Sequence, residues 1–228
     1  MKDAIAKYPD SVLLKQTLIQ YYEDNGNYDV ALAETDNYLK KDSTNIDFLD
    51  KKAQLHLLKG DTLSTIKCLE KIVDIFPEPA FIISLGAIYA ESKNPKALQI
   101  ADALLIGNKA NADKEAIFIK GLYYSSIGEK NKALNYFDEC LKLDYTYMDA
   151  YLEKGAALYD LKKYNDALLV FNRAVTIENG YDIGHYWMGK CFEKLNKPTE
   201  AIESYKTALL YNKDLIEARD ALGKLGIK

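Results

Sequence analysis

Apolar and polar residues alternate along the chain in blocks of about a dozen residues, and each block has the spacing of one face of a helix. In one block, Ile117, Gly121 and Tyr124 lie at positions i, i+4 and i+7. After a short polar turn, Ala133 and Phe137 begin the same spacing in the next block. Such a pair of blocks predicts two helices packed as a hairpin, with a small residue on one helix facing a large residue on the other.

The hairpin pattern recurs with a period of 34 residues. A glycine column follows this period at Gly121, Gly155, Gly189 and Gly223. Two further columns keep the same period, a small one at Ala133, Ala167 and Ala201 and an aromatic one at Phe137, Phe171 and Tyr205. Because three columns share one period, the chain is predicted to be an array of helical hairpins.

The residues in these columns carry a family resemblance. Tyr151, Gly155 and Leu158 are followed by Ala167 and, four residues later, Phe171. This order of aromatic, glycine, apolar residue and Ala-x3-Phe resembles the tetratricopeptide repeat (TPR). The resemblance implies an all-α fold, a right-handed α-solenoid in which helix-turn-helix repeats stack into a superhelix.

The period divides the chain into six expected repeats with a partial unit at each end. The repeats are expected at 12–45, 46–79, 80–113, 114–147, 148–181 and 182–215. Residues 1–11 are expected to form the second helix of a partial repeat, and residues 216–228 a capping helix that shields the last repeat from water. Since the sequence begins halfway through a repeat, we expect it to be a fragment of a longer protein.

One repeat departs from the period. A small residue is expected at position 99, where Gln99 stands, and the pair Ala97 and Ala101 comes two positions early. This slip predicts a shortened turn at 92–94, with Pro95 at the first position of the following helix. A longer link at 107–111 is expected to restore the register, so that the array stays continuous.

Composition adds mainly exclusions. The chain is 48% hydrophobic and 28% charged, with a net charge of -4, so it lacks the basic field that attracts nucleic acid. No apolar run approaches the roughly 18 residues that cross a bilayer, and membrane insertion is not expected. The N-terminus has no secretory signal, which favours the cytoplasm, or export if a leader precedes Met1.

Candidate chemistry is sparse. No phosphate-binding loop, nucleophile elbow or zinc-binding helix motif occurs, and Cys68, Cys140 and Cys191 are too far apart in sequence for a zinc pattern. His56 and His185 fall in aromatic packing columns. Most of the 18 Tyr fall in packing columns as well. We therefore expect a non-enzymatic protein with no catalytic residues, no cofactor and no metal.

The resemblance implies that the first helix of each repeat lines a concave groove that receives a peptide or a partner helix. The first two repeats supply mostly polar and acidic positions to this groove, namely Gln16, Gln20, Glu23, Asp24, Asp47, Asp50, Lys51 and Gln54. The later repeats supply an apolar floor with acidic edges. The candidate partner-binding residues are Ile83, Ala87, Phe118, Leu122, Leu152, Tyr159, Tyr186, Trp187 and Lys190.

The aromatic groove positions have two open interpretations. They are either anchors for a ligand or packing residues, with Phe118 tucked against the next repeat and Trp187 packed on the final helix. As anchors, they would favour a protein or peptide with apolar and basic side chains. The clamp of Lys, Arg and Asn by which co-chaperone TPRs bind the heat-shock carboxy-terminal peptide is not reproduced, so that ligand is not expected.

Two other functions compete with peptide binding. One is self-association, in which the N-terminal edge or the groove receives another copy of the chain. The other is RNA recognition by a helical repeat, which needs a basic groove to meet phosphates. Because the groove positions carry more carboxylates than lysines, RNA is the weaker alternative.

Overall fold

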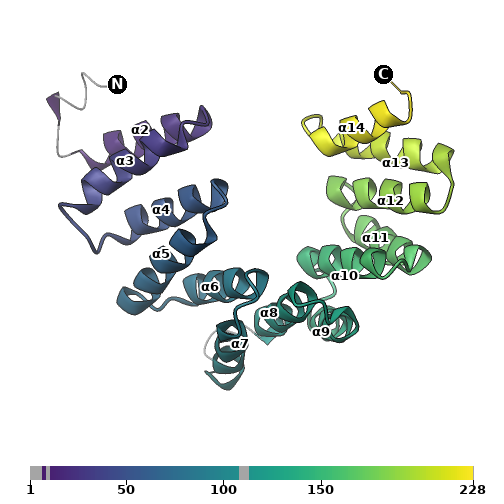
Figure 1. The fold of residues 1–228 in the computed structure, drawn as a ribbon, viewed down its shortest axis with the longest axis horizontal. Helices are drawn as coiled ribbons and strands as arrows, with labels where there is room; N and C mark the ends of the chain where they lie inside the picture. The colour runs from purple at the N-terminus through teal and green to yellow at the C-terminus, as the bar shows by residue number, and fades with distance from the viewer. Residues whose placement is uncertain (1–6, 9–10, 108–112, 228) are drawn as a thin grey trace. The chain divides into compact units, whose positions relative to one another are not determined.

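The computed structural model describes residues 7–8, 11–107 and 113–227. These residues form helices and no strands, which confirms the all-α helical-repeat fold (Figure 1). The helices are α2 (Val12–Asp24), α3 (Tyr28–Leu39), α4 (Ile46–Leu58), α5 (Thr62–Ile75), α6 (Pro79–Glu91), α7 (Lys96–Gly107), α8 (Asp113–Ser126), α9 (Lys130–Leu143), α10 (Met148–Asp160), α11 (Tyr164–Ile177), α12 (Asp182–Lys194), α13 (Pro198–Tyr211) and α14 (Ile216–Lys224). The prediction of a helix within 1–11 falls, apart from Lys7, Tyr8 and Ser11, outside the described residues.

Two compact units divide the chain, one ending at Ser92 and the other beginning at Lys93. The sequence predicts one continuous array instead. The division falls at the predicted register slip, where Ala97 and Ala101 are fully buried and Gln99 is exposed. The two-position slip is therefore present in the structure. The predicted longer link at 107–111 lies almost entirely outside the described residues.

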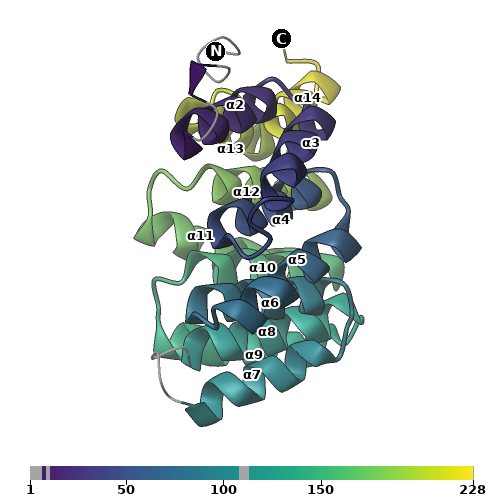
Figure 2. The ribbon, with the colours of Figure 1, turned by 90° about the vertical axis from the view of Figure 1, so that its left-hand side faces the viewer.

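Within each unit, helices adjacent in sequence pack side by side (Figures 1 and 2). Five of the turns within these units, each joining the two helices of one hairpin, contain a residue with a left-handed backbone. Gly26, Gly60 and Gly128 supply it, and Lys162 and Asn196 adopt it without glycine. These five positions again follow the 34-residue period. The period places one more turn residue at position 94, between Gly60 and Gly128. In that turn the left-handed residue is Lys93, one position before the expected one, as a shortened turn requires.

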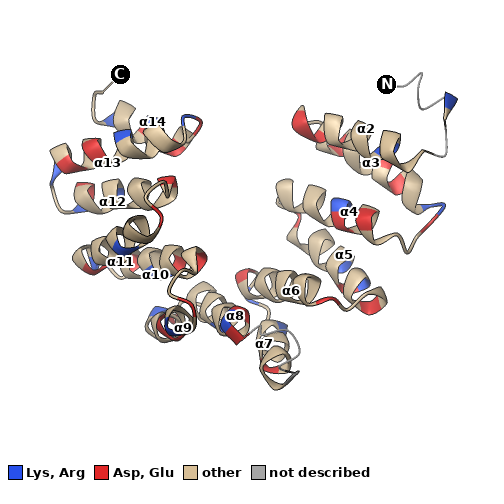
Figure 3. Ribbon diagram, turned by 180° about the vertical axis from the view of Figure 1, so that it is seen from behind, with Lys and Arg blue, Asp and Glu red and all other residues tan. Residues whose placement is uncertain are grey.

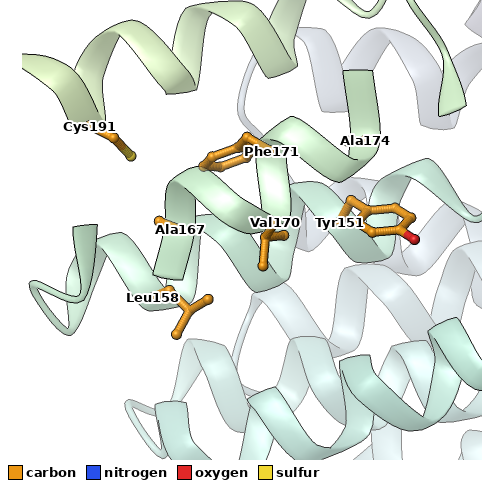
Figure 4. Packing of buried hydrophobic residues seen from close by; sticks show 7 residues of the cluster. All are labelled: Tyr151, Leu158, Ala167, Val170, Phe171, Ala174 and Cys191. Atoms are coloured by element: carbon orange, nitrogen blue, oxygen red, sulfur yellow. The ribbon is translucent and has the colours of Figure 1, made fainter. Parts of the chain in front are cut away.

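The glycine column permits close approach of the paired helices. A Cβ added to Gly121, Gly155 or Gly189 would lie 2.3–2.5 Å from a ring carbon of the aromatic residue 16 positions later. Those aromatic residues, Phe137, Phe171 and Tyr205, are fully buried. Figure 4 shows Phe171 among Ala167, Ala174 and Cys191 in the cluster formed by α10, α11 and α12. The predicted pairing of a small residue with a large one is confirmed in these three hairpins.

Ion pairs connect successive repeats at a recurring position. Lys52 pairs with Asp36 at 2.6 Å, and Lys154 pairs with Asp138, each joining residues 16 apart. The equivalent pair in the slipped repeat, Lys120 with Asp102 at 2.7 Å, joins residues 18 apart. The two-residue slip is thus repeated in the side-chain contacts. Because such pairs are partly exposed, each contributes about 0.2–1 kcal/mol to stability.

Asp144, at the end of α9, is held by an unusually complete set of donors. Lys114 donates to it at 2.6 Å, and the hydroxyl and backbone N–H of Thr146 donate at 2.6 and 2.9 Å. These bonds, Lys114 first, lower the pKa of Asp144 to about 2. Since the folded pKa lies below the ordinary value of 3.8, the stabilisation is present above pH 3.8 and is lost as the pH falls through about 2.

An NMR titration of the Asp144 carboxyl carbon should therefore give a pKa of about 2 in the wild-type protein. Lys114→Met should move that pKa back toward 3.8, because the largest of the three stabilising bonds is removed. Lys120→Met, whose lysine pairs with Asp102, is the matched control and should leave Asp144 unchanged. An Asp144 pKa near 3.8 in the wild-type protein would show that this network does not form in solution.

Candidate functional site

An aromatic cluster around a lysine lies in the second compact unit. Tyr159 comes from the end of α10, and Tyr186, Trp187 and Lys190 come from α12. The Lys190 ammonium nitrogen lies 3.7 Å from the centre of the Trp187 ring, 4.9 Å from that of Tyr159 and 5.7 Å from that of Tyr186. These distances are those of cation–π contacts. All four side chains are half-buried, and we call them the aromatic cluster below.

Trp187 is held from one side by the core. Its ring stacks on Phe171 with centroids 5.7 Å apart and an interplanar angle of 13°, and it meets the Tyr159 ring edge at 5.4 Å. The suggestion that Trp187 packs on the final helix is therefore wrong. Tyr186 packs with the cluster of α13 and α14 instead, its ring 5.8 Å from that of Tyr205. Trp187 and Tyr186 are therefore neighbours in sequence that pack against different clusters of the core.

A cavity of about 200 Å³ opens beside the aromatic cluster. Its lining comes from α10, α12, α13 and α14 and consists of Tyr159, Tyr186, Lys190, Glu193, Lys194, Tyr205, Glu217, Ala221 and Lys224. Glu193 accepts a hydrogen bond from the Tyr205 hydroxyl. Three lysines and two glutamates therefore share the lining, and the charge of the cavity wall is mixed rather than acidic.

Burial changes the titration of the cluster. It raises the pKa of Tyr159 to about 12 and also raises that of Tyr186, so both hydroxyls remain protonated hydrogen-bond donors to a higher pH than an exposed tyrosine with the ordinary pKa of 10. Burial lowers the pKa of Lys190, because the rings remove water from the ammonium group. No carboxylate lies within ion-pair distance of Lys190 in the described part of the chain. The positive charge of Lys190 is therefore stabilised mainly by the aromatic rings.

The other predicted groove residues of the second unit pack against the core. Leu122 is buried in the core, and half-buried Leu152 packs against the cluster of Figure 4. Phe118 is also half-buried, with ring centroids 5.9 Å from Phe137 and 5.1 Å from Tyr147. Packing explains these three positions without a ligand. Leu122 is 7% exposed, so only a small part of its side chain is open to a partner.

Ile83 and Ala87 are half-buried on α6 and belong to the first compact unit. The aromatic cluster belongs to the second compact unit.

The contribution of α14 to the site is not expected from the sequence. Glu217, Ala221 and Lys224 line the cavity, whereas residues 216–228 were expected only to cap the array. Lys224 lies one period of 34 residues after Lys190. The glycine column already extends to Gly223, so the same period could have placed α14 in the position of a further first helix.

The two histidines have ordinary packing surroundings. His56 Nδ1 lies 3.3 Å from Asp61 Oδ2, and burial lowers the pKa of His56. His185 Nε2 lies 3.2 Å from the Asn179 carbonyl oxygen, and its ring stacks on Tyr211. Within the described ranges, no group of His, Cys, Asp and Glu is arranged to hold a metal ion. No helix in those ranges is long and apolar enough to cross a membrane.

Known proteins share this fold and part of this sequence. A tetratricopeptide repeat model matches residues 120–183, and a second matches residues 184–215. The TPR repeat-containing protein MJ1428 of Methanocaldococcus jannaschii is 26% identical over 223 residues, which cover 87% of this chain and 39% of that protein. The small glutamine-rich tetratricopeptide repeat-containing protein 2 of Saccharomyces cerevisiae is 30% identical over 108 residues, covering 47% and 27%. The chain thus spans well under half the length of these relatives.

Solved structures agree on the fold. A tetratricopeptide repeat protein from Parabacteroides merdae superimposes with a TM-score of 0.76 at 18% identity, covering 97% of this chain and 88% of that one. The type IV pilus biogenesis factor PilW superimposes with a TM-score of 0.64 at 17% identity, covering 92% and 97%. The 34-residue columns, the buried small and large pairs and these matches lead to one assignment. The chain belongs to the tetratricopeptide repeat family.

Proposed function

We propose that the second compact unit binds a peptide or helix of a partner protein at the aromatic cluster of Tyr159, Tyr186, Trp187 and Lys190. The tetratricopeptide repeat fold is consistent with a protein–protein interaction scaffold. One observation carries the finer proposal: three aromatic rings remain half-buried, and two of them line an open cavity. Aromatic residues that are held in place and partly open to water are typical binding anchors.

The cluster suits an apolar side chain. The rings are fixed by Phe171 and Tyr205 beneath them, so that little side-chain entropy is lost when a ligand covers them. The sequence-based expectation of a partner with both apolar and basic side chains finds support here only in its apolar part. Because Lys190, Lys194 and Lys224 line the same cavity as two glutamates, the wall offers a basic side chain no net attraction.

We infer that binding, and not catalysis, is the role of these residues. Tetratricopeptide repeat proteins are generally non-enzymatic scaffolds. The buried thiols of Cys140 and Cys191 have pKa values raised to about 12, mainly by burial, which makes them poor nucleophiles at neutral pH. The two histidines contact a carboxylate and a backbone carbonyl, respectively, and lie far apart in sequence on α4 and α12.

Tyr186→Leu should weaken binding of a partner captured by the wild-type protein by about thirtyfold, the loss of about 2 kcal/mol typical of an aromatic anchor. Leucine keeps apolar contact with the core of α13 and α14 but removes the ring from the cavity wall. The partner would be isolated by affinity capture and its Kd for each variant measured by isothermal titration calorimetry.

Tyr145→Leu is the matched control, since Tyr145 lies in the loop between α9 and α10 and is 64% exposed. Its Kd should stay within about twofold of the wild-type value. Equal Kd values for the wild-type protein and the Tyr186→Leu variant, with equal helix content by circular dichroism, would remove the aromatic cluster from the binding site.

A further inference from the structure

A separate cavity of about 350 Å³ lies in the first compact unit, between the first helices of the first two repeats. Gln16, Ile19 and Gln20 line it from α2, and Asp47, Phe48 and Lys51 line it from α4. Its size is at the lower end of the range for ligand pockets, enough for one long side chain. Gln16, Gln20, Asp47 and Lys51 are among the polar groove positions expected from the sequence, whereas none of the six residues is among the candidate partner-binding residues.

The floor of this cavity is apolar and rigid. Ile19 and Phe48 are each 1% exposed, and the Phe48 ring stacks on Tyr38 with centroids 3.7 Å apart and an interplanar angle of 12°. A ligand that covers this floor needs an apolar stem, because no polar group of the floor offers it a hydrogen bond. The fixed rings also mean that the cavity exists before a ligand arrives.

One wall of the cavity is polar but already satisfied. The Lys51 ammonium donates to Glu23 at 2.9 Å and to the Gln20 side-chain oxygen at 3.2 Å. Gln20 in turn donates to Asp24 at 2.8 Å. The lysine of this wall is therefore neutralised by its own ion pair and is held in place.

The opposite wall has unused acceptors. Asp47 and Gln16 are exposed, and neither side chain has a hydrogen bond or ion pair with any residue that the structure describes. One turn after Asp47, the half-buried Asp50 accepts a hydrogen bond from Gln54 at 2.7 Å. Burial is the main cause that raises the pKa of Asp50, and the nearby Asp47 makes a smaller contribution.

The cavity lining thus carries one carboxylate, Asp47, and one lysine, Lys51, whose charge is paired with Glu23. Asp24 and Asp50 lie one turn away from the lining residues Gln20 and Asp47 (acidic positions are red on α2 and α4 in Figure 3). We propose that this cavity binds the side chain of an arginine or lysine of a partner protein. The aliphatic stem lies on Ile19 and Phe48, and the cationic head reaches the Asp47 carboxylate and the Gln16 side-chain oxygen. An anionic side chain would meet the unpaired Asp47 and is rejected.

This proposal does not depend on the aromatic cluster. The acidic cavity and the aromatic cluster lie in different compact units, and each can fail its test while the other passes. The sequence predicts a partner with both basic and apolar side chains. In the two proposals the first unit binds a basic side chain of a partner, and the second unit binds an apolar one.

The test is an NMR titration of the full ¹⁵N-labelled chain with N-acetyl-arginine N-methylamide, which carries the proposed side chain and little else. The probe should shift the signals of Gln16, Gln20 and Phe48 saturably, with a Kd on the order of 1 mM, as its small size implies. Two further probes, with a norleucine and a glutamate side chain, separate the contributions of stem and charge. The norleucine probe should bind about fivefold more weakly, and the glutamate probe should not saturate.

Asp47→Asn tests the acceptor directly and keeps the size of the exposed side chain. It should weaken binding of the arginine probe by about fivefold, whereas Asp74→Asn, which changes an exposed carboxylate elsewhere in the same unit, should leave the Kd within about twofold. The proposal is overturned if Asp47→Asn behaves like Asp74→Asn. It is also overturned if the arginine and norleucine probes bind equally, or if the shifted signals lie outside α2 and α4.

Discussion

Phe171→Ala should lower the free energy of unfolding by about 3–5 kcal/mol, the largest change expected of any substitution considered for this protein. The Phe171 ring is fully buried, lies against Gly155 and supports the stacked Trp187 ring. Its removal leaves a cavity that rigid helices on both sides cannot fill. Urea denaturation followed by circular dichroism measures this change.

A second readout of Phe171→Ala is local. Trp187 is the only tryptophan, so its fluorescence reports on this part of the second unit alone. Its emission should shift to longer wavelength in the folded variant, because the ring loses the partner that shields one face. Leu169→Ala, on the same helix but 70% exposed, is the control and should change stability by less than about 0.5 kcal/mol. Equal effects of the two substitutions would contradict the packing described for α11.

Gly155→Ala should destabilise the protein by about 1–3 kcal/mol, although alanine is the better helix former by about 1 kcal/mol. The added Cβ would lie 2.3 Å from one carbon of the Phe171 ring and 2.6 and 2.7 Å from two others. Phe171 cannot turn away, since Trp187 stacks on it. The helices α10 and α11 would therefore have to separate, and chemical denaturation would show the cost.

Gly223→Ala is the matched control in the same sequence column. Nothing lies within 4 Å of a Cβ added to Gly223, because no second helix follows α14 in the described residues. This substitution should stabilise the protein by about 0.5 kcal/mol, through the higher helix propensity of alanine. Changes of the same sign at the two glycines would show that the column does not mark the close approach of paired helices.

Much of the fold can be predicted from the sequence, because the same pattern of small and large residues recurs in several repeats. The pairs of Gly121 with Phe137 and Gly155 with Phe171 stand in recurring columns of the sequence, and the helices bring each pair into contact. The slip at Ala97 is visible for the same reason. The columns do not predict the boundary between the two compact units after Ser92. A shortened turn in the sequence does not show how tightly the helices on its two sides pack.

The candidate site was predicted less well, because a helical position on the first-helix face can be open or covered. Leu122 and Lys190 are assigned to the same groove from equivalent positions, two periods of 34 residues apart, yet Leu122 is buried and Lys190 is half-buried. The difference depends on the sizes of neighbouring side chains from other helices, which no single repeat encodes. The sequence places Gln16, Gln20, Asp47 and Lys51 in the groove, but it does not show that Ile19 and Phe48 form an apolar floor beneath them.

Photo-cross-linking tests the proposed binding face most directly. Benzoylphenylalanine in place of Tyr186 should form a cross-link to the captured partner, since this side chain lines the cavity beside the aromatic cluster. The same group in place of exposed Tyr145 should form none. Cross-links at position 186 and not at 145 are the predicted result. Cross-links at 145 with none at 186, from a variant that still captures the partner, would contradict the assignment of the aromatic cluster as the binding face.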